Sequence, residues 1–125
     1  MLFFLVLIIL SCAKPNILDG YDEDQLLDKW WQLEVDNNLV ENYINETYGY
    51  PVCFFLDTNG LAFILNQDYE LWEYTYKIIE KQKYLINNST EITISKIDSN
   101  KDRWHLELKE NMFKYEGYAY SCTFM

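Results

Sequence analysis

The chain has 125 residues, enough for one domain with a modest core, and its 20 acidic side chains against 10 Lys and Arg give a formal net charge of −10 at pH 7. This acidity argues against nucleic acid as a partner, because phosphates are held by Lys and Arg, and it provides no electrostatic attraction to anionic lipid. It is compatible with a basic protein or a cationic ligand as partner, and equally with a solvated acidic surface that only confers solubility.

An unbroken apolar run, Leu2–Leu10, lies at the start of the chain and is followed by the small residue Ser11. The run is too short to cross a bilayer, which takes about 20 apolar residues, but it has the length of the apolar region of a signal peptide. The segment Ile9–Cys12 resembles the bacterial lipobox. The resemblance implies that residues 1–11 are a signal peptide and that Cys12 becomes the mature first residue, with acyl chains such as palmitate that anchor it to the cell membrane or outer membrane. The alternative is an ordinary secreted protein with Cys12 unmodified.

The segment after the apolar run reads as a tether that leads into a folded domain. Residues 12–21 contain a proline and a glycine, show no periodicity and are predicted to form a lipidated tether, which leaves residues 22–125 as the domain. Asp22–Asp28 is predicted to form a short helix, because its acidic first turn interacts favourably with the helix dipole. Leu26 and Leu27 are then expected to cap the domain.

From Trp30 onward the sequence reads as short strands joined by brief turns. Alternation is clearest where Trp104, Leu106 and Leu108 fall on one face and charged residues fall on the other. The dipeptide Asn59-Gly60 lies between two apolar runs and predicts a hairpin, since both residue types tolerate positive φ.

Eight to ten short strands can be counted in this way, and no predicted helix is long enough for a parallel crossover. The fold class is therefore predicted to be all-β: a single small antiparallel meander that closes into a barrel, with a short N-terminal helix. A two-sheet β-sandwich is the alternative. In the last segment, the apolar residues move from one set of alternate positions to the other at Gly117. This change predicts a bulge or a tight turn there.

Two cysteines remain after Cys12, namely Cys53 and Cys122. In an oxidising compartment such a pair is predicted to form a disulfide bond. The bond would close a loop of about 70 residues and contribute roughly 4 kcal/mol of stability on the chain-entropy description. Two separate buried thiols are the alternative.

The order of these features resembles the lipocalin-like domains of bacterial lipoproteins. Leu26–Trp31 looks like that family's short helix followed by a first-strand tryptophan, and Thr90–Leu108 looks like its strand of alternating isoleucines leading through a polar turn into a strand of alternating Trp and Leu. The resemblance covers roughly residues 25–124. It implies a barrel that binds a ligand or another protein, usually without catalysis.

No motif predicts catalysis, a metal site or a cofactor. His105 is the only histidine, so no multi-histidine zinc site is possible, and no nucleophile motif or Gly-rich phosphate loop is present. Asp98-x-Asn100-x-Asp102 matches the opening of a calcium loop, but Arg103 stands where that loop needs glycine, so a polar hairpin turn is predicted instead. We expect a protein that is not an enzyme.

Aromatic residues are unusually abundant, with 11 Tyr, 7 Phe and 4 Trp making up 18% of the chain. Tyrosine combines a large apolar face with a polar tip, so such residues suit the wall of a ligand cavity. Phe63, Trp72, Tyr74 and Tyr76 are the candidate ligand-binding residues. The alternative is that these rings only fill the core and rim of the barrel.

Two functions remain open from the sequence. The first is a membrane-tethered lipoprotein whose lipocalin-like barrel binds a small apolar or aromatic ligand. The second is a protein-interaction or inhibitor lipoprotein whose acidic surface meets a basic exported partner. A ligand cavity lined by aromatic residues favours the first function, and a filled barrel favours the second.

Overall fold

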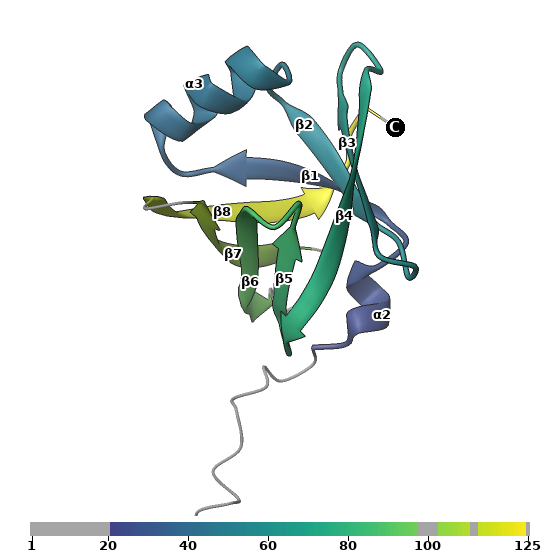
Figure 1. The fold of residues 1–125 in the computed structure, drawn as a ribbon. Coiled ribbons are helices and arrows are strands. Elements are labelled where there is room, and N and C mark those ends of the chain that lie inside the picture. The colour runs from purple at the N-terminus through teal and green to yellow at the C-terminus, as the bar shows by residue number, and fades with distance from the viewer. Residues whose placement is uncertain (1–20, 98–102, 111–112, 125) are drawn as a thin grey trace, which may run out of the picture.

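A computed structural model describes residues 21–97, 103–110 and 113–124, and these form a closed antiparallel β-barrel of eight strands (Figure 1). Each strand pairs with the next along the chain, and the last strand closes the barrel against the first. The predicted all-β barrel is confirmed, and the two-sheet sandwich is not the fold. The strands are β1 (Trp30–Val35), β2 (Val52–Leu56), β3 (Leu61–Asn66), β4 (Leu71–Glu80), β5 (Lys83–Ile86), β6 (Thr90–Ile97), β7 (Arg103–Glu110) and β8 (Phe113–Ser121).

The alternating side chains of the strands build the interior of the barrel. Trp104, Leu106 and Leu108 of β7 are all buried, as their spacing predicts. Trp104 is fully buried, and its ring packs edge-on against Trp31 of β1. Along β6, Ile92 and Ile94 continue the same apolar layer. The main core therefore lies inside the barrel and is formed by inward-facing residues of successive strands.

A short helix, α2 (Glu23–Leu26), closes one end of the barrel. Its N-cap is Asp22, whose carboxylate accepts a hydrogen bond from the Asp24 amide at 3.0 Å, as the acidic start of this segment favours. Leu26 is buried in the main core, and its carbonyl oxygen accepts a hydrogen bond from the indole nitrogen of Trp31 at 2.8 Å. This end of the barrel is thus filled by side chains.

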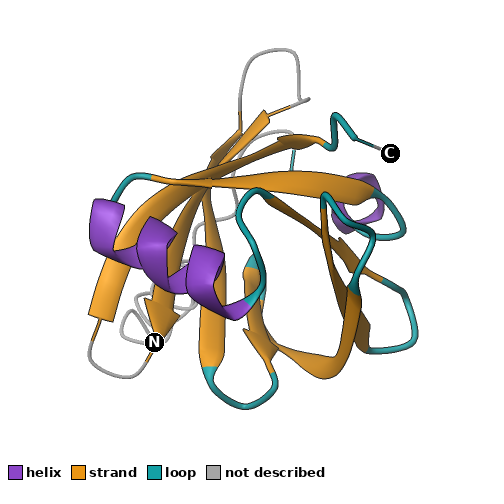
Figure 2. Ribbon diagram, turned by 90° about the horizontal axis from the view of Figure 1, so that it is seen from above, coloured by secondary structure: helices purple, strands orange, loops and turns teal. Residues whose placement is uncertain are grey.

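A second helix, α3 (Asn38–Thr47), corrects the expectation that strands follow one another without interruption from Trp30. The side chain of Asn37 caps it by accepting hydrogen bonds from the amides of Leu39 and Val40. Val40 and Ile44 lie one turn apart and face Val35 of β1 and Val52 of β2 in a second, smaller core. Figure 2 shows α3 lying across the strands at the end of the barrel away from α2.

The β2–β3 hairpin forms where Asn59-Gly60 predicts it, but only Gly60 has a positive φ, of 90°. Asp57 organises the loop instead, because its carboxylate accepts hydrogen bonds from the amides of Asn59 and Leu61. The turn is therefore held by an aspartate side chain together with one glycine.

Gly117 does not mark a bulge or a turn, which corrects the expected phase shift. It lies in the middle of β8, in regular register with Val35 of β1 and Leu106 of β7. A side chain is excluded there because a Cβ atom would lie 2.7 Å from the carbonyl oxygen of Glu34. The register shifts in the described barrel fall instead in β4, between Ile78 and Glu80, and in β6.

Cys53 and Cys122 form the predicted disulfide bond, with their Cα atoms 5.9 Å apart. Cys53 lies on β2 and Cys122 directly follows β8, so the bond joins two strands that flank β1. The amide of Cys122 also donates a hydrogen bond to the carbonyl of Trp30. The bond thus ties the C-terminal end of the chain to the barrel wall where the barrel closes.

Several predicted features lie outside the described residues: the apolar run, Cys12, the tether up to residue 20 and the polar turn at 98–102. Within the described ranges, none of the helices has the length and apolar character needed to cross a bilayer.

Candidate ligand-binding pocket

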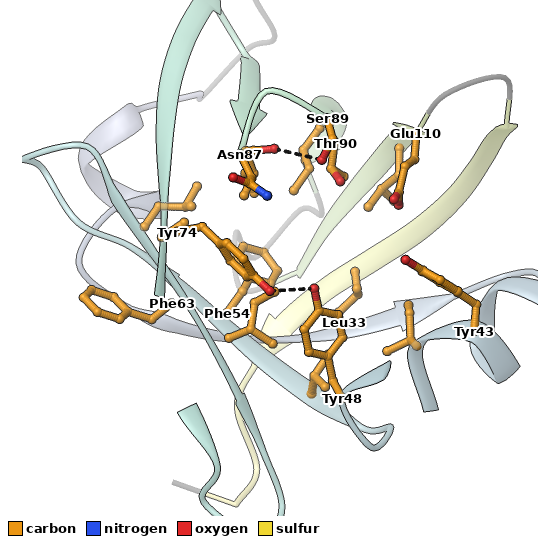
Figure 3. Close-up of a pocket in the computed structure, with 18 of the residues that line it drawn as sticks. Leu33, Tyr43, Tyr48, Phe54, Phe63, Tyr74, Asn87, Ser89, Thr90 and Glu110 are labelled. Atoms are coloured by element: carbon orange, nitrogen blue, oxygen red, sulfur yellow. Dashed lines mark hydrogen bonds between the residues drawn. The ribbon is translucent and has the colours of Figure 1, made fainter. Parts of the chain in front are cut away.

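A pocket of about 220 Å³ opens at the end of the barrel that carries α3 (Figure 3). Its inner wall is apolar and consists of inward-facing residues of six strands, which continue the layers of the main core. Its outer part is bounded by α3, the β5–β6 turn and the end of β7. The apolar wall residues include Leu33, Phe54, Ala62, Ile64, Ile86, Ile92 and Leu108.

The rim of the pocket is polar and rich in tyrosine. The phenol oxygens of Tyr48 and Tyr74 are hydrogen-bonded to each other at 3.1 Å. Tyr43 on α3 and Tyr115 on β8 complete the tyrosine rim, and Asn87 faces them from the β5–β6 turn. In Figure 3 the hydroxyl groups of Tyr43, Tyr48 and Tyr74 point toward the open space between these elements.

The phenols of Tyr48 and Tyr115 remain neutral at physiological pH. Burial raises the pKa of Tyr115 to about 12, and the negative charge of Glu110 adds to the shift. Burial also raises the pKa of Tyr48, and the hydrogen bond that Tyr48 shares with Tyr74 and the charge of Glu110 contribute as well. Two neutral phenols of the rim, those of Tyr48 and Tyr115, are therefore within the electrostatic influence of one carboxylate.

Glu110 is the only charged residue among the described residues that line the pocket. It lies two positions beyond Leu108 on β7, so it continues the inward-facing series of Leu106 and Leu108. Among the described residues its carboxylate forms no ion pair. The interior series of β7 thus ends in an uncompensated negative charge at the mouth of the pocket.

A shallower apolar groove of about 390 Å³ adjoins the mouth of the pocket, between α3 and the β7–β8 hairpin. It shares Tyr43, Glu110 and Tyr115 with the pocket. Leu39 and Phe113 form its outer sides and are 78% and 69% exposed. The apolar surface of the pocket therefore extends outward onto the surface of the molecule.

The four candidate ligand-binding residues predicted from the sequence lie in different parts of the barrel. Tyr74 lines the pocket, and Trp72 lies beside it with its ring edge-on to Tyr48 at a centroid distance of 4.9 Å. Tyr76 lies deeper, in the main core, where its hydroxyl donates a hydrogen bond to the carbonyl of Asp57.

Phe63 borders the pocket, but its ring belongs to the outer face of the barrel. It is paired with Phe55 across the β2–β3 ladder, and their ring centroids are 6.2 Å apart. Phe55 in turn packs on Trp30 of β1, with a distance of 5.1 Å between the ring centroids. These three rings therefore form a row along the outer wall. Phe63 shares no face with Tyr74, because the two lie on opposite sides of the sheet.

Sequence reasoning missed Tyr43, Tyr48, Glu110 and Tyr115. The two tyrosines linked to α3 were missed because no helix is predicted in that segment, although Asn37 followed by apolar residues at a spacing of four is a helix signal. Glu110 could be predicted from the alternation on β7, because it lies two residues after the buried Leu108 and so on the same face of the strand.

His105 lies on the outer wall and takes no part in the pocket. Its Nδ1 atom is hydrogen-bonded to the hydroxyl of Ser95, and its Nε2 atom lies 3.7 Å from a carboxylate oxygen of Glu116. Beside it, the guanidinium of Arg103 stacks 4.1 Å from the ring centre of Tyr118. In the described part of the chain, no group of three or more His, Cys, Asp and Glu side chains is arranged to hold a metal ion.

The described part of the chain is a small closed β-barrel that is filled at one end and hollow at the other. The chain matches no family model and no curated protein sequence.

Proposed function

We propose that this protein is an exported, lipid-anchored β-barrel that binds a small apolar or aromatic molecule in its pocket and performs no catalysis. The observation that carries the proposal is the cavity of about 220 Å³ at the α3 end, with an apolar wall and a polar rim. Ligand sites in general combine a mostly apolar concave surface with a few polar groups that orient the ligand.

The volume of the pocket limits the size of the ligand. An engineered apolar cavity of about 150 Å³ is known to bind benzene, whereas pockets for drug-sized molecules span about 300–1,000 Å³. At about 220 Å³ the pocket is suited to a single ring with a short substituent, or to a short chain. A longer ligand would extend into the groove beside Leu39 and Phe113.

The position of the pocket is compatible with an anchor at Cys12. The described chain enters the barrel through α2, and Figure 1 shows α2 and α3 at opposite ends of the molecule. An anchor that precedes α2 leaves the mouth of the pocket, at the α3 end, facing away from the point of attachment. The lipobox-like segment Ile9–Cys12 supports such an anchor.

A pair of variants on β6 tests ligand uptake. Thr90→Trp places a large ring at the rim, where Thr90 lines the pocket, whereas Thr93→Trp adds the same ring on the opposite face of the strand. We expect Thr90→Trp to weaken binding of phenethyl alcohol at least tenfold by calorimetry, and Thr93→Trp to leave the affinity unchanged. Equal affinities for both variants and the unmodified protein would show that the molecule binds elsewhere or not at all.

The anchor is tested separately, by intact-mass measurement of the native protein and by fractionation of Cys12→Ser. We expect a mature chain that begins at an acylated Cys12, and loss of the Cys12→Ser variant from the membrane fraction. A native mass that includes the initiator Met1 and lacks acyl groups would contradict this part of the proposal.

A second candidate function is a protein-interaction role, which the exposed apolar groove favours. Leu39 and Phe113 are both mostly exposed, and exposed large apolar residues gathered in one groove suit a partner. With a net charge of −10, the partner would be a basic exported protein, held less tightly as salt rises. Salt-sensitive cross-linking at positions 39 and 113 to such a protein would support this role.

A further inference from the structure

The charge that the described residues place at the mouth of the pocket is negative. No Lys, Arg or His is found among the described residues that line the pocket, and Glu110 is its only charged group. The negative charge of Glu110 reaches the rim, because it contributes to the raised pKa of both Tyr48 and Tyr115. Any ligand that fills the apolar interior therefore meets a negative potential at the opening.

The neutral groups around Glu110 also suit a cation. Phenol oxygens accept hydrogen bonds, and the faces of tyrosine rings attract positive charge through their quadrupole. Tyr43, Tyr48 and Tyr74 point toward the opening (Figure 3), and Tyr115 of β8 also lines the pocket. An ammonium group placed among them has a carboxylate, several hydroxyl oxygens and aromatic rings within one small space.

We infer that the ligand of this pocket is an aromatic or apolar amine, whose hydrocarbon part fills the barrel while its ammonium group lies at the rim between Glu110 and the tyrosines. The inference rests on the proposed binding function and goes beyond it by assigning the charge of the ligand. Fatty acids and other carboxylates are excluded by the same groups, because no basic side chain lines the described pocket to compensate a second negative charge.

Three ligands of one skeleton test the inference: phenethylamine, phenethyl alcohol and phenylacetate, which are cationic, neutral and anionic at neutral pH. Binding to the full mature protein is measured by calorimetry. We expect the amine to bind about tenfold more tightly than the alcohol, and phenylacetate to bind more weakly than either. The affinity for the alcohol measures the contribution of the apolar pocket. The ratio of the affinities for the amine and the alcohol measures the contribution of the charged rim.

Glu110→Gln removes the charge and retains the shape of the side chain. We expect it to abolish the preference for the amine while the affinity for the alcohol stays within about twofold. Glu107→Gln is the matched control, because it removes the same charge from an exposed, outward-facing position on the same strand. That variant should retain the full preference for the amine.

The outcomes separate this inference from the proposed function. If the alcohol binds and the amine shows no advantage, or if its advantage persists in Glu110→Gln, the inference is wrong while the binding function stands. If none of the three molecules binds at any accessible concentration, the proposed function and the inference both fall.

Discussion

At the scale of the residue, Gly117 shows how tightly the strands meet where the barrel closes. Its hypothetical Cβ atom would lie 2.7 Å from the carbonyl oxygen of Glu34 and 3.2 Å from the Cδ1 atom of Leu108. The first of these neighbours is backbone in a paired strand, which cannot give way without moving β1. The absence of a side chain thus permits the close approach of β8 to β1.

Gly117→Ala should therefore destabilise the protein. Overpacking at a well-packed position costs about 1–3 kcal/mol, which exceeds the gain of about 0.5–1 kcal/mol from replacing a flexible glycine in a strand. Urea denaturation followed by circular dichroism measures the difference in the free energy of unfolding. Ser121→Ala, at an exposed position of the same strand, serves as control and should have little effect. A Gly117→Ala protein of unchanged stability would show that the strands can separate at little cost.

At the scale of the element, α3 turns a closed barrel into one with a bounded pocket. Ile44 is buried against Val35 and Val52, which fixes the helix on the barrel end. The helix then carries Tyr43 to the rim, and Tyr48 follows directly at its C-cap. The geometry of the rim therefore depends on a helix of ten residues that begins at a single capping side chain.

Asn37→Ala should loosen α3, because the Asn37 side chain accepts hydrogen bonds from two amides of the first turn. Loss of an N-cap of this kind costs about 1 kcal/mol. We expect a loss of this size in urea denaturation, together with weaker binding of phenethyl alcohol. The matched control is Asn42→Ala at an exposed position within the helix, where alanine is the better helix former. Equal effects of the two variants would contradict a capping role for Asn37.

At the scale of the whole molecule, tyrosines link the core to the pocket. At the filled end, Tyr21 and Tyr84 share a hydrogen bond between their hydroxyl groups, and at the hollow end Tyr48 and Tyr74 do the same. Burial raises the pKa of Tyr84 above its ordinary value, as it does for Tyr48. The fold therefore depends on phenols that stay protonated.

This dependence predicts alkaline unfolding. Burial raises the pKa of Tyr76 and Tyr115 from 10.0 to about 12. The unfolded chain releases these protons more readily than the folded protein. The contribution of the two protonated phenols to the free energy of unfolding is therefore complete below pH 10 and is lost as the pH rises through about 12. The midpoint of urea denaturation should be constant below this pH range and should fall within it, as the absorbance of phenolate rises. In Tyr115→Phe the fall should be shallower. A midpoint that stays level through the window would contradict the prediction.

The walls of the barrel could be predicted from the sequence because alternation is a local property. Trp104, Leu106 and Leu108 show their buried face by spacing alone. Cys53 and Cys122 are the two cysteines left after Cys12, and they form the predicted disulfide bond. Trp72 and Tyr74 were found by the same rule, as inward-facing residues of one strand.

The residues that meet at the hollow end could not be predicted without the folded barrel. Phe63 and Tyr74 look equivalent in the sequence, yet cross-strand register places the first on the outer wall and the second in the pocket. Tyr48 and Glu110 are far apart in the sequence and come together at one rim. The strands, their buried faces and the disulfide pair follow from local spacing and composition, so they could be predicted before the barrel was known. Barrel closure and the docking of α3 determined the pocket, because a cavity is a relation between distant segments that no local pattern encodes.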